Sequence, residues 1–428
     1  MSSDFDSYGS YVDLLGSPRV FMHEINTLPM FSKIMSTVDE IEKYERVFPI
    51  SRSNDIVLTK TMPEKSYTDW LSSVGLGAGK VLVLKGQNTE TLPERAVKNG
   101  LRKKLDSYYG DTKKNVNFSP YYGGFLESRA SQHLDLQMYA NSDLVVKYDS
   151  KVNFKNLCKS VGVPVVDDVI ISRKTDNSTK NLNKLLEKVT DFLSESGMVI
   201  AKGEFGASGS TTTTYRDFDM QKLKQSVAQA KSDNCRYIVE PFLPSTASPS
   251  SLWFISREHT ITHVRTSNQV LSNDGLVHAG NEFPVPFNEE KLRNLSYKVA
   301  YKLNEEGYIG PFGMDYIVSN DKFYAVECNP RVTGANYPWE LVHLLNVKHG
   351  SNDHIKAARS QNVHLSKKGL TFNDFARQNK KLLYTGDTAN GVVVPYNVGP
   401  ISSGKVTVLA TGSNAIEVSQ LLTSIRGN

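Results

Sequence analysis

One stretch of the chain decides the fold: Gly310-Pro-Phe-Gly-Met-Asp-Tyr-Ile-Val-Ser-Asn-Asp-Lys-Phe-Tyr-Ala-Val-Glu-Cys-Asn-Pro-Arg331. It contains two mostly apolar runs, 314–318 and 323–326, which are separated by the short polar segment 319–322. Apolar runs of this length around a polar turn are typical of a β-hairpin. The stretch therefore predicts two paired antiparallel strands, and the side chains at their ends indicate what the hairpin does.

Three oxygen-bearing side chains stand at particular places in this hairpin. Asp315 interrupts the first apolar run, and Glu327 and Asn329 follow the second. Because alternate residues of a strand share a face, Glu327 and Asn329 point the same way, whereas Cys328 points away from them into the core. Carboxylate and amide oxygens are hard ligands that suit Mg²⁺ held jointly with phosphates. The hairpin therefore predicts a metal site at Asp315, Glu327 and Asn329.

The connection between the strands decides whether the two carboxylates meet. A two-residue turn at 320–321 pairs Asp315 with Val326, whereas a three-residue loop or a bulge pairs Asp315 with Glu327. The metal site requires the second arrangement. The alternative is a buried ion pair with Arg331 and no metal.

Further upstream, a lysine ends an apolar strand at 198–202 and a run of small residues follows it. Glycine lets backbone N–H groups approach phosphate oxygens, and serine adds hydroxyl donors. Lys202 can act as a point charge for a phosphate. A solvated loop beside an exposed lysine is the alternative. The loop residues predicted to contact phosphate are Gly206, Ala207, Ser208, Gly209 and Ser210.

The segment 237–243 predicts a strand that runs into Glu240, Pro241, Phe242 and Leu243. Adenine needs a backbone carbonyl for its amine and a backbone N–H for a ring nitrogen. Pro241 keeps its carbonyl although it has no N–H, and Leu243 can donate. An adenine-binding hinge is one interpretation, and an ordinary strand end is the other.

A further lysine opens a helix predicted over 151–161, which Gly162 and Pro164 end. Lys151 can reach a second phosphate from that position, although a lysine at a helix start is more often a surface residue. Amphipathic helices are also predicted over 179–196 and 288–305, with a third at 217–231.

The flanking regions predict two further units. The apolar runs 56–59, 81–84 and 144–146 indicate buried strands of a small α/β domain. The runs 392–394 and 406–408 lie among Gly, Pro and Asn and indicate strands of a separate small lobe.

The order of these motifs resembles the ATP-grasp superfamily over about 145–350. The resemblance implies an ATP-grasp fold, in which two α+β lobes grip ATP, with an N-terminal α/β pre-ATP-grasp domain and a small C-terminal lobe. The implied domains are 1–145, 146–350 with its two lobes divided at 240, and 351–428. Two Mg²⁺ ions, for which Mn²⁺ substitutes, are the implied metals.

By the same resemblance, Lys151 and Lys202 contact phosphates, 206–210 form a mobile phosphate loop and 240–243 form the adenine hinge. Arg331 matches an arginine that some members place near the reacting carboxylate. Other members carry a phosphate-binding arginine where this chain has Gly313, and Arg265 is the predicted replacement.

More narrowly, the stretches 327–335 and 391–410 resemble the pheganomycin-type peptide ligases. This implies an ADP-forming enzyme that joins a carboxylate of an amino acid or peptide-like acid to an amine through an acylphosphate. It also implies a role in secondary metabolite biosynthesis and a homodimer. Two alternatives stay open, an ATP-grasp kinase that phosphorylates a small molecule and a regulatory protein that binds ATP without chemistry.

Composition narrows the class of protein. The 50 Lys and Arg against 45 Asp and Glu leave a net charge of +5, which permits an anionic ligand but does not indicate a nucleic-acid partner. Three well-separated cysteines favour a reducing compartment. The chain shows no signal-peptide pattern and no apolar run of about 18 residues, so we expect a cytoplasmic protein without a membrane segment.

Overall fold

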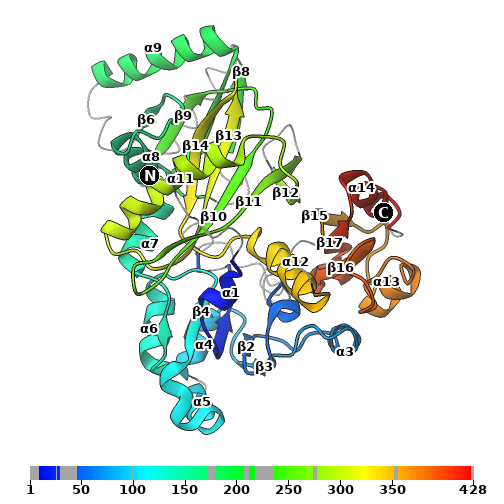
Figure 1. Cartoon of the computed structure of the whole chain (residues 1–428). Coiled ribbons are helices and arrows are strands. Elements are labelled where there is room, and N and C mark those ends of the chain that lie inside the picture. Colours follow the sequence, from blue (N-terminus) through cyan, green and yellow to red (C-terminus); the bar gives the residue numbers. More distant parts are fainter. Residues whose placement is uncertain are drawn as a thin grey trace.

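The computed structural model describes residues 9–25, 27–28, 46–98, 100–171, 179–206, 212–216, 236–272, 277–350 and 355–425, with the backbone alone at 179–185. Its strands form three sheets, of five, four and eight strands (Figure 1). The predicted helix at 217–231 and loop residues 207–210 lie outside the described residues.

The N-terminal sheet is parallel, with strand order β3-β2-β1-β4-β5. Its strands are β1 (Arg19–Met22), β2 (Ile56–Thr59), β3 (Lys80–Val83), β4 (Asn117–Pro120) and β5 (Gln137–Met138). Strands β1 and β2 are buried throughout, as expected for a parallel sheet covered on both faces. The chain order reverses between β1 and β4, and ligands of such sheets bind beyond the carboxyl ends at that point.

The helical elements of this region are α1 (Tyr11–Leu14), η1 (Phe48–Ile50), α3 (Lys65–Ser73), α4 (Leu92–Lys98), α5 (Leu101–Tyr109), η2 (Gly110–Asn115), α6 (Phe125–Leu134) and α7 (Ser142–Asp149). The predicted strand at 144–146 is wrong, because these residues lie within α7. The N–H of Leu144 donates to the Asn141 side chain, which caps that helix. Three apolar residues do not distinguish a strand from a helix, and the cap decided the outcome.

The four-stranded sheet is antiparallel, with strand order β6-β9-β7-β8, and forms the upper lobe in Figure 1. Its elements are α8 (Lys151–Ser160), β6 (Val169–Ile171), α9 (Thr179–Ser196), β7 (Met198–Gly203), β8 (Thr212–Arg216) and β9 (Tyr237–Pro241). The predicted helices at 151–161 and 179–196 are confirmed. Val189 and Phe192 of α9 pack against Val199 of β7, which explains the apolar stripe of that helix.

The eight-stranded sheet has the order β14-β13-β10-β11-β12-β15-β17-β16. Its strands are β10 (Pro249–Ile255), β11 (Ile261–Ser272), β12 (Val277–Phe283), β13 (Gly310–Ser319), β14 (Lys322–Asn329), β15 (Ala357–His364), β16 (Val392–Asn397) and β17 (Lys405–Gly412). The associated helical elements are α11 (Glu289–Glu305), α12 (Asn336–Lys348), α13 (Phe372–Gln378), η4 (Gly399–Ser403) and α14 (Ala415–Thr423).

The predicted C-terminal strands at 392–394 and 406–408 are confirmed, but they do not form a sheet of their own. Strand β15 pairs with β12, for example Arg359 with Glu282, and β17 pairs with β15. The edge of β12 offers unpaired backbone groups, and pairing with β15 satisfies them. The eight-stranded sheet therefore extends from the ATP-grasp region predicted at 146–350 into the C-terminal region.

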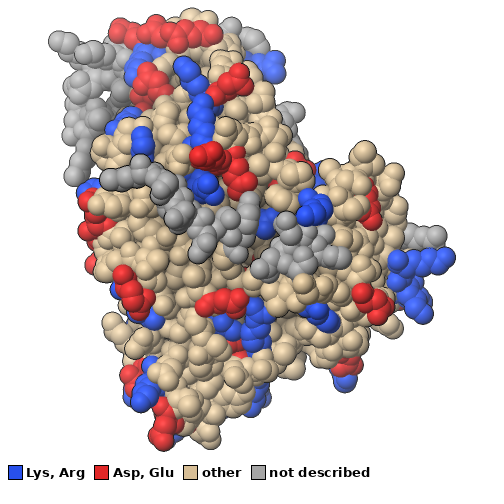
Figure 2. All heavy atoms as spheres, in the orientation of Figure 1, with Lys and Arg blue, Asp and Glu red and all other residues tan. Residues whose placement is uncertain are grey.

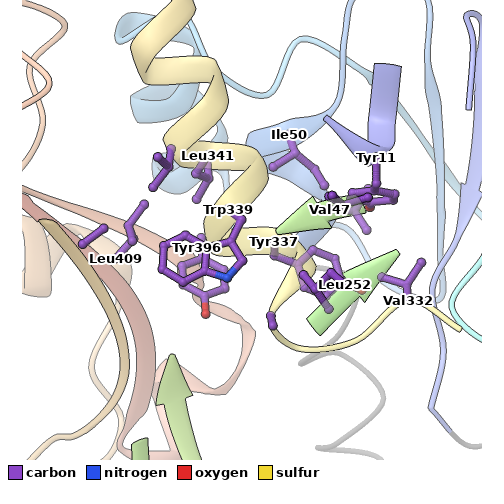
Figure 3. Close-up of a cluster of buried hydrophobic side chains, with 14 of the residues drawn as sticks. Tyr11, Val47, Ile50, Leu252, Val332, Tyr337, Trp339, Leu341, Tyr396 and Leu409 are labelled. Atoms are coloured by element: carbon purple, nitrogen blue, oxygen red, sulfur yellow. The ribbon is translucent and has the colours of Figure 1, made fainter. Parts of the chain in front are cut away.

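One hydrophobic cluster joins all three parts of the chain. Figure 3 shows Tyr11, Val47 and Ile50 of the N-terminal part close to α12, and Tyr396 and Leu409 of the C-terminal strands on another side. The three parts thus pack together around α12. The domain limits at 145 and 350 stay predictions.

Two further observations concern the surface and the cysteines. Lys and Arg are interspersed with Asp and Glu on the face shown in Figure 2. No helix within the described ranges is long and apolar enough to span a membrane. Cys158 and Cys328 are free and buried, as predicted for Cys328, and Cys235 lies outside the described residues.

Candidate active site

The β13–β14 hairpin combines a two-residue turn with a bulge. Asn320 and Asp321 both have positive φ, 48° and 57°, as a type I′ turn requires. Pairing runs from Ser319–Lys322 to Tyr316–Ala325, and then the register shifts so that Asp315 lies opposite Glu327. The bulge skips Val326 and brings the two carboxylates together, which is the register that the metal hypothesis requires.

The three predicted metal ligands contact one another and two cations. Asn329 Nδ2 donates to Asp315 Oδ2 (3.0 Å), and Arg331 Nη2 donates to Asn329 Oδ1 (2.6 Å). Lys151 Nζ lies 2.7 Å from Glu327 Oε2. The amide oxygen of Asn329 therefore faces Arg331, and Lys151 is the ion-pair partner of the Glu327 carboxylate.

The two carboxylates differ in their electrostatics. Burial, followed by the negative charge of Glu327, raises the pKa of Asp315 to about 7. Burial also opposes ionisation of Glu327, but the Lys151 ammonium holds the pKa of Glu327 below its usual value. Two carboxylates held face to face repel each other, and a bound divalent cation would relieve this repulsion.

This donor set fits Mg²⁺. Among the described residues, no group of three or more His, Cys, Asp or Glu side chains could hold a metal ion, so an ion here would be held by two carboxylates and one amide. Mg²⁺ commonly keeps few protein ligands and completes its shell with phosphate oxygens and water.

Lys202 takes part in a buried chain of charges. Its Nζ lies 2.6 Å from Glu240 Oε2, and Lys155 Nζ contacts the other carboxylate oxygen. Although burial opposes ionisation, Lys202 and Lys155 hold the pKa of Glu240 below its usual value. The Glu240 side chain thus orients two lysines, and only the backbone that follows it can serve as a hinge. The sequence did not indicate a role for Lys155, because a lysine in the middle of helix α8 belongs to no motif.

A cavity of about 180 Å³ brings most of the predicted ATP-binding residues together. Its apolar walls include Val166, Ile200 and Ile317. The predicted site residues that line it are Lys151, Lys202, Gly206, Glu240, Pro241, Phe242, Leu243, Asp315 and Glu327. The narrow cavity thus brings the predicted hinge, the two lysines and two of the predicted metal ligands together.

A larger cavity of about 740 Å³ adjoins this one and shares Asp315, Glu327, Gln269 and Leu271 with it. Asn329 and Arg331 also line the larger cavity. Tyr121 and Ile25, which follow the carboxyl ends of β4 and β1, form part of its wall. The crevice of the parallel sheet therefore opens onto the predicted metal ligands.

A polar network positions Lys151 and the start of the glycine-rich loop. The backbone N–H of Lys151 donates to the carbonyl of Glu204 (3.0 Å), and Lys151 Nζ donates to the carbonyl of Gly206 (3.2 Å). The Glu204 carboxylate accepts from Ser150 Oγ, which caps α8, and forms an ion pair with Arg236. The helix start and the loop are thereby tied together.

Arg265 does not line either cavity. Its guanidinium lies 4.4 Å from the centre of the Phe283 ring and 5.1 Å from that of Trp339. An arginine at Gly313 would not fit either, because an added Cβ would lie 2.9 Å from Thr333 Cγ2. Arg46 does line the larger cavity, yet it stands about 270 residues before the hairpin and outside every motif.

Two comparisons with known proteins agree with this geometry, one with family models and one with solved structures. A family model described as an ATP-grasp domain matches residues 172–335. No curated protein sequence matches the chain.

Several solved structures have a similar fold at low sequence identity. Biotin carboxylase from Campylobacter jejuni is similar at 13% identity and a TM-score of 0.59, over 96% of this chain and 91% of that one. N5-carboxyaminoimidazole synthetase from Staphylococcus aureus, complexed with ADP, is similar at 10% identity and a TM-score of 0.54, over 98% of this chain and 97% of that one. N5-carboxyaminoimidazole synthase from Aspergillus clavatus, in complex with ADP and 5-aminoimidazole ribonucleotide, is similar at 11% identity and a TM-score of 0.54, over 96% of this chain and 98% of that one. The chain has the ATP-grasp fold, and the predicted fold class is confirmed.

Proposed function

We propose that this protein is an ATP-dependent, ADP-forming ligase that joins a carboxylate to an amine through an acylphosphate. The observation that carries the proposal is the shared wall of the two cavities. Asp315 and Glu327 border both the narrow cavity, with its hinge and lysines, and the wide polar cavity, with Arg331. A phosphoryl group can therefore pass from a nucleotide on one side to an acid on the other.

The chain's own cations stabilise the negative charge that develops during this transfer. Lys151 and Lys202 are held beside Glu327 and Glu240, and both ammonium groups reach the narrow cavity. Mg²⁺ bound by Asp315, Glu327 and Asn329 would add charge neutralisation on the phosphates. Preorganised charges of this kind lower the barrier for phosphoryl transfer. Residues 206–210 stay a predicted phosphate loop.

Arg331 orients the reacting carboxylate in this scheme. Its side chain is 6% exposed, lines the wide cavity and lies over the Tyr121 ring at 5.4 Å. Its buried Nε has no hydrogen-bond partner among the described residues. A substrate carboxylate would supply the missing acceptor, because a guanidinium donates two parallel hydrogen bonds to such a group.

The size and lining of the wide cavity favour amino-acid or peptide-like substrates. A volume of about 740 Å³ is in the range of pockets that enclose drug-sized ligands, and polar side chains such as Gln361 and Asn362 line it. The structures with a similar fold include synthetases of a small molecule, one of them solved with ADP and 5-aminoimidazole ribonucleotide. A peptide ligase of the pheganomycin type, two metal ions with Mn²⁺ as a substitute, and a homodimer are the finer parts of this proposal.

The test is ADP release with Mg-ATP against a panel of amino acids and short peptides, singly and in pairs, with mass spectrometry of the products. A ligase releases ADP only with an acid and an amine together and yields a product lighter than their sum by one water. A phosphorylated single substrate would identify a kinase instead. Tight ATP binding without ADP release from any pair would indicate a regulatory protein.

A further inference from the structure

The wide cavity has more positive than negative side chains in its described lining. Asp315 and Glu327 are its two carboxylates, and both lie on the wall that it shares with the narrow cavity. Since these two are the predicted metal ligands, the rest of the described lining carries only positive or neutral groups, and such a lining favours an anionic ligand. The basic side chains that line the cavity are Arg46, His278, Arg331, Arg359, His364 and Lys405.

Arg359, on β15, keeps side-chain donors available to a ligand. Its Nη1 lies 3.7 Å from Glu282 Oε2, an ion pair longer than a hydrogen bond. The other carboxylate oxygen of Glu282 accepts from Asn268 Nδ2 (2.8 Å), and Glu282 does not line the cavity. Arg359 Nε is buried and has no hydrogen-bond partner within the part of the chain that the structure describes. Because a guanidinium has five N–H donors, Arg359 can hold its ion pair and bind an anion as well.

Arg359 and Arg331 belong to opposite sides of the eight-stranded sheet. Arg331 follows the end of β14, the neighbour of β13. Arg359 pairs with Glu282 on β12, and Glu282 pairs with Asn268 on β11, so β12, β11 and β10 separate β15 from β13. These four strand spacings of about 4.8 Å amount to about 19 Å between the backbones of β13 and β15. The two arginines are therefore placed to bind two different groups of one ligand.

We propose that the acid substrate carries a second anionic group, which Arg359 binds, an inference that rests on the proposed function. Arg331 holds the reacting carboxylate beside the predicted metal ligands, and Arg359 holds a carboxylate or a phosphate on the β15 side of the wide cavity. A guanidinium donates parallel hydrogen bonds to either anion. The buried Nε of Arg359 gains an acceptor in this way, and leaving such a donor without one costs free energy. The substrate class is thus a peptide-like acid with two negative groups.

The experiment measures by calorimetry how tightly defined peptides bind to the full chain in the presence of Mg-ADP, so that no chemical step is needed. Each probe is an N-acetyl peptide whose first residue is glutamine, glutamate or phosphoserine, followed by one to three alanines and a free C-terminal carboxylate. Glutamine and glutamate have nearly the same shape, so the ratio of their Kd values reports the second charge. The tighter-binding of the two charged peptides identifies the anion as a carboxylate or a phosphate.

Three variants are compared with the wild type. Arg359→Gln removes the proposed second anion site, and Arg331→Gln removes the proposed site of the reacting carboxylate. The matched control is Arg102→Gln, because Arg102 forms an exposed ion pair with Asp135 at 3.2 Å and lines neither cavity.

The wild type is expected to bind a glutamate or phosphoserine peptide at least about tenfold more tightly than the matching glutamine peptide. Arg359→Gln should reduce this ratio to within about threefold while the Kd of the glutamine peptide stays within about threefold of the wild type. Arg331→Gln should weaken all the peptides and keep the ratio, and Arg102→Gln should match the wild type.

Three results overturn the inference. They are a wild-type ratio near one at every peptide length, a ratio that survives in Arg359→Gln, and no binding of any peptide at millimolar concentration. Equal weakening of the glutamine and glutamate peptides in Arg359→Gln also overturns it, because that is the result of a merely structural role. ADP release with an acid and an amine tests the ligase separately, so a ligase that lacks this charge preference leaves the proposed function standing.

Discussion

Lys151 Nζ lies 2.7 Å from Glu327 Oε2, so a helix start and the end of a hairpin strand more than 170 residues away meet in one ion pair. Both side chains line the narrow cavity. The pair places the lysine and the carboxylate at the point where phosphates and a divalent cation would enter. In a complex with ATP, the Glu327 carboxylate would bind the cation and Lys151 would bind a phosphate, in place of their ion pair with each other.

Glu327→Gln is therefore expected to remove Mg²⁺ binding as well as turnover. ADP release should fall by about 10² to 10³, the usual loss for one preorganised charge at a reacting group. Thermal melting gives a second measurement, because a bound ion stabilises only a protein that binds it. Mg²⁺ should raise the melting temperature of the wild type more than that of Glu327→Gln. An equal Mg²⁺ shift in both proteins would show that Glu327 is not a ligand.

Glu240→Gln tests the buried chain of Lys202, Glu240 and Lys155. Removing the carboxylate leaves two ammonium groups without their shared counter-ion, and breaking a buried pair costs about 3–5 kcal/mol. We expect the free energy of unfolding in urea to fall by about 3 kcal/mol and the KM for ATP to rise. The matched control is Glu306→Gln, which breaks the partly exposed pair with Lys147 and should cost less than about 1 kcal/mol. Similar losses in both variants would contradict the positioning role of Glu240.

Arg46 and Arg265 are the two candidates for the cation that Gly313 lacks. Arg46→Gln removes a guanidinium that lines the wide cavity, so the KM for the acid should rise at least about tenfold, in line with a lost charged hydrogen bond. Arg265→Gln removes a cation packed on Phe283 and Trp339 and should lower the melting temperature while leaving the KM within about threefold. Steady-state kinetics of the two variants decide between them, and the opposite ranking would restore Arg265 as the substrate-binding residue.

His343 and Asp13 predict a pH dependence of stability, because they connect α12 to α1 at 3.2 Å. The hydrogen bond to Asp13 raises the pKa of His343 above its usual value, and the same hydrogen bond lowers the pKa of Asp13 to about 2. The pair therefore stabilises the fold fully between about pH 4 and 6.5. Its contribution is lost as pH rises through the raised pKa of His343 and as it falls through the lowered pKa of Asp13.

The measurement is urea unfolding of the wild type and His343→Asn across pH 5 to 9. The wild type should be more stable at pH 5.5 by less than about 1 kcal/mol, because Asp13 is largely exposed. This difference should shrink toward zero above the raised pKa. A difference that stays constant with pH would show that the ion pair makes no contribution and that the loss comes from packing.

Local patterns were enough to predict the strands and helices that carry the site. The hairpin around Asp315 and Glu327 and the helix that begins at Lys151 were predicted from residues that are neighbours in the chain. These elements follow from short-range physics: alternation on strands, caps, and turn residues that tolerate positive φ. The same reasoning failed at 144–146, because three apolar residues are too few to separate helix from strand.

The sequence by itself thus determined the fold class, the order of the motifs and nine of the residues that line the narrow cavity. Only the tertiary structure decided which hairpin register forms, that Glu240 serves Lys155 and Lys202, and that Arg46 and His278 reach the wide cavity. The physical reason is that these relationships depend on packing between segments far apart in the chain. A β-bulge costs little free energy in the hairpin itself, so whether it forms depends on which side chains the whole sheet buries. Contacts between segments far apart in the chain leave no periodic pattern in the sequence.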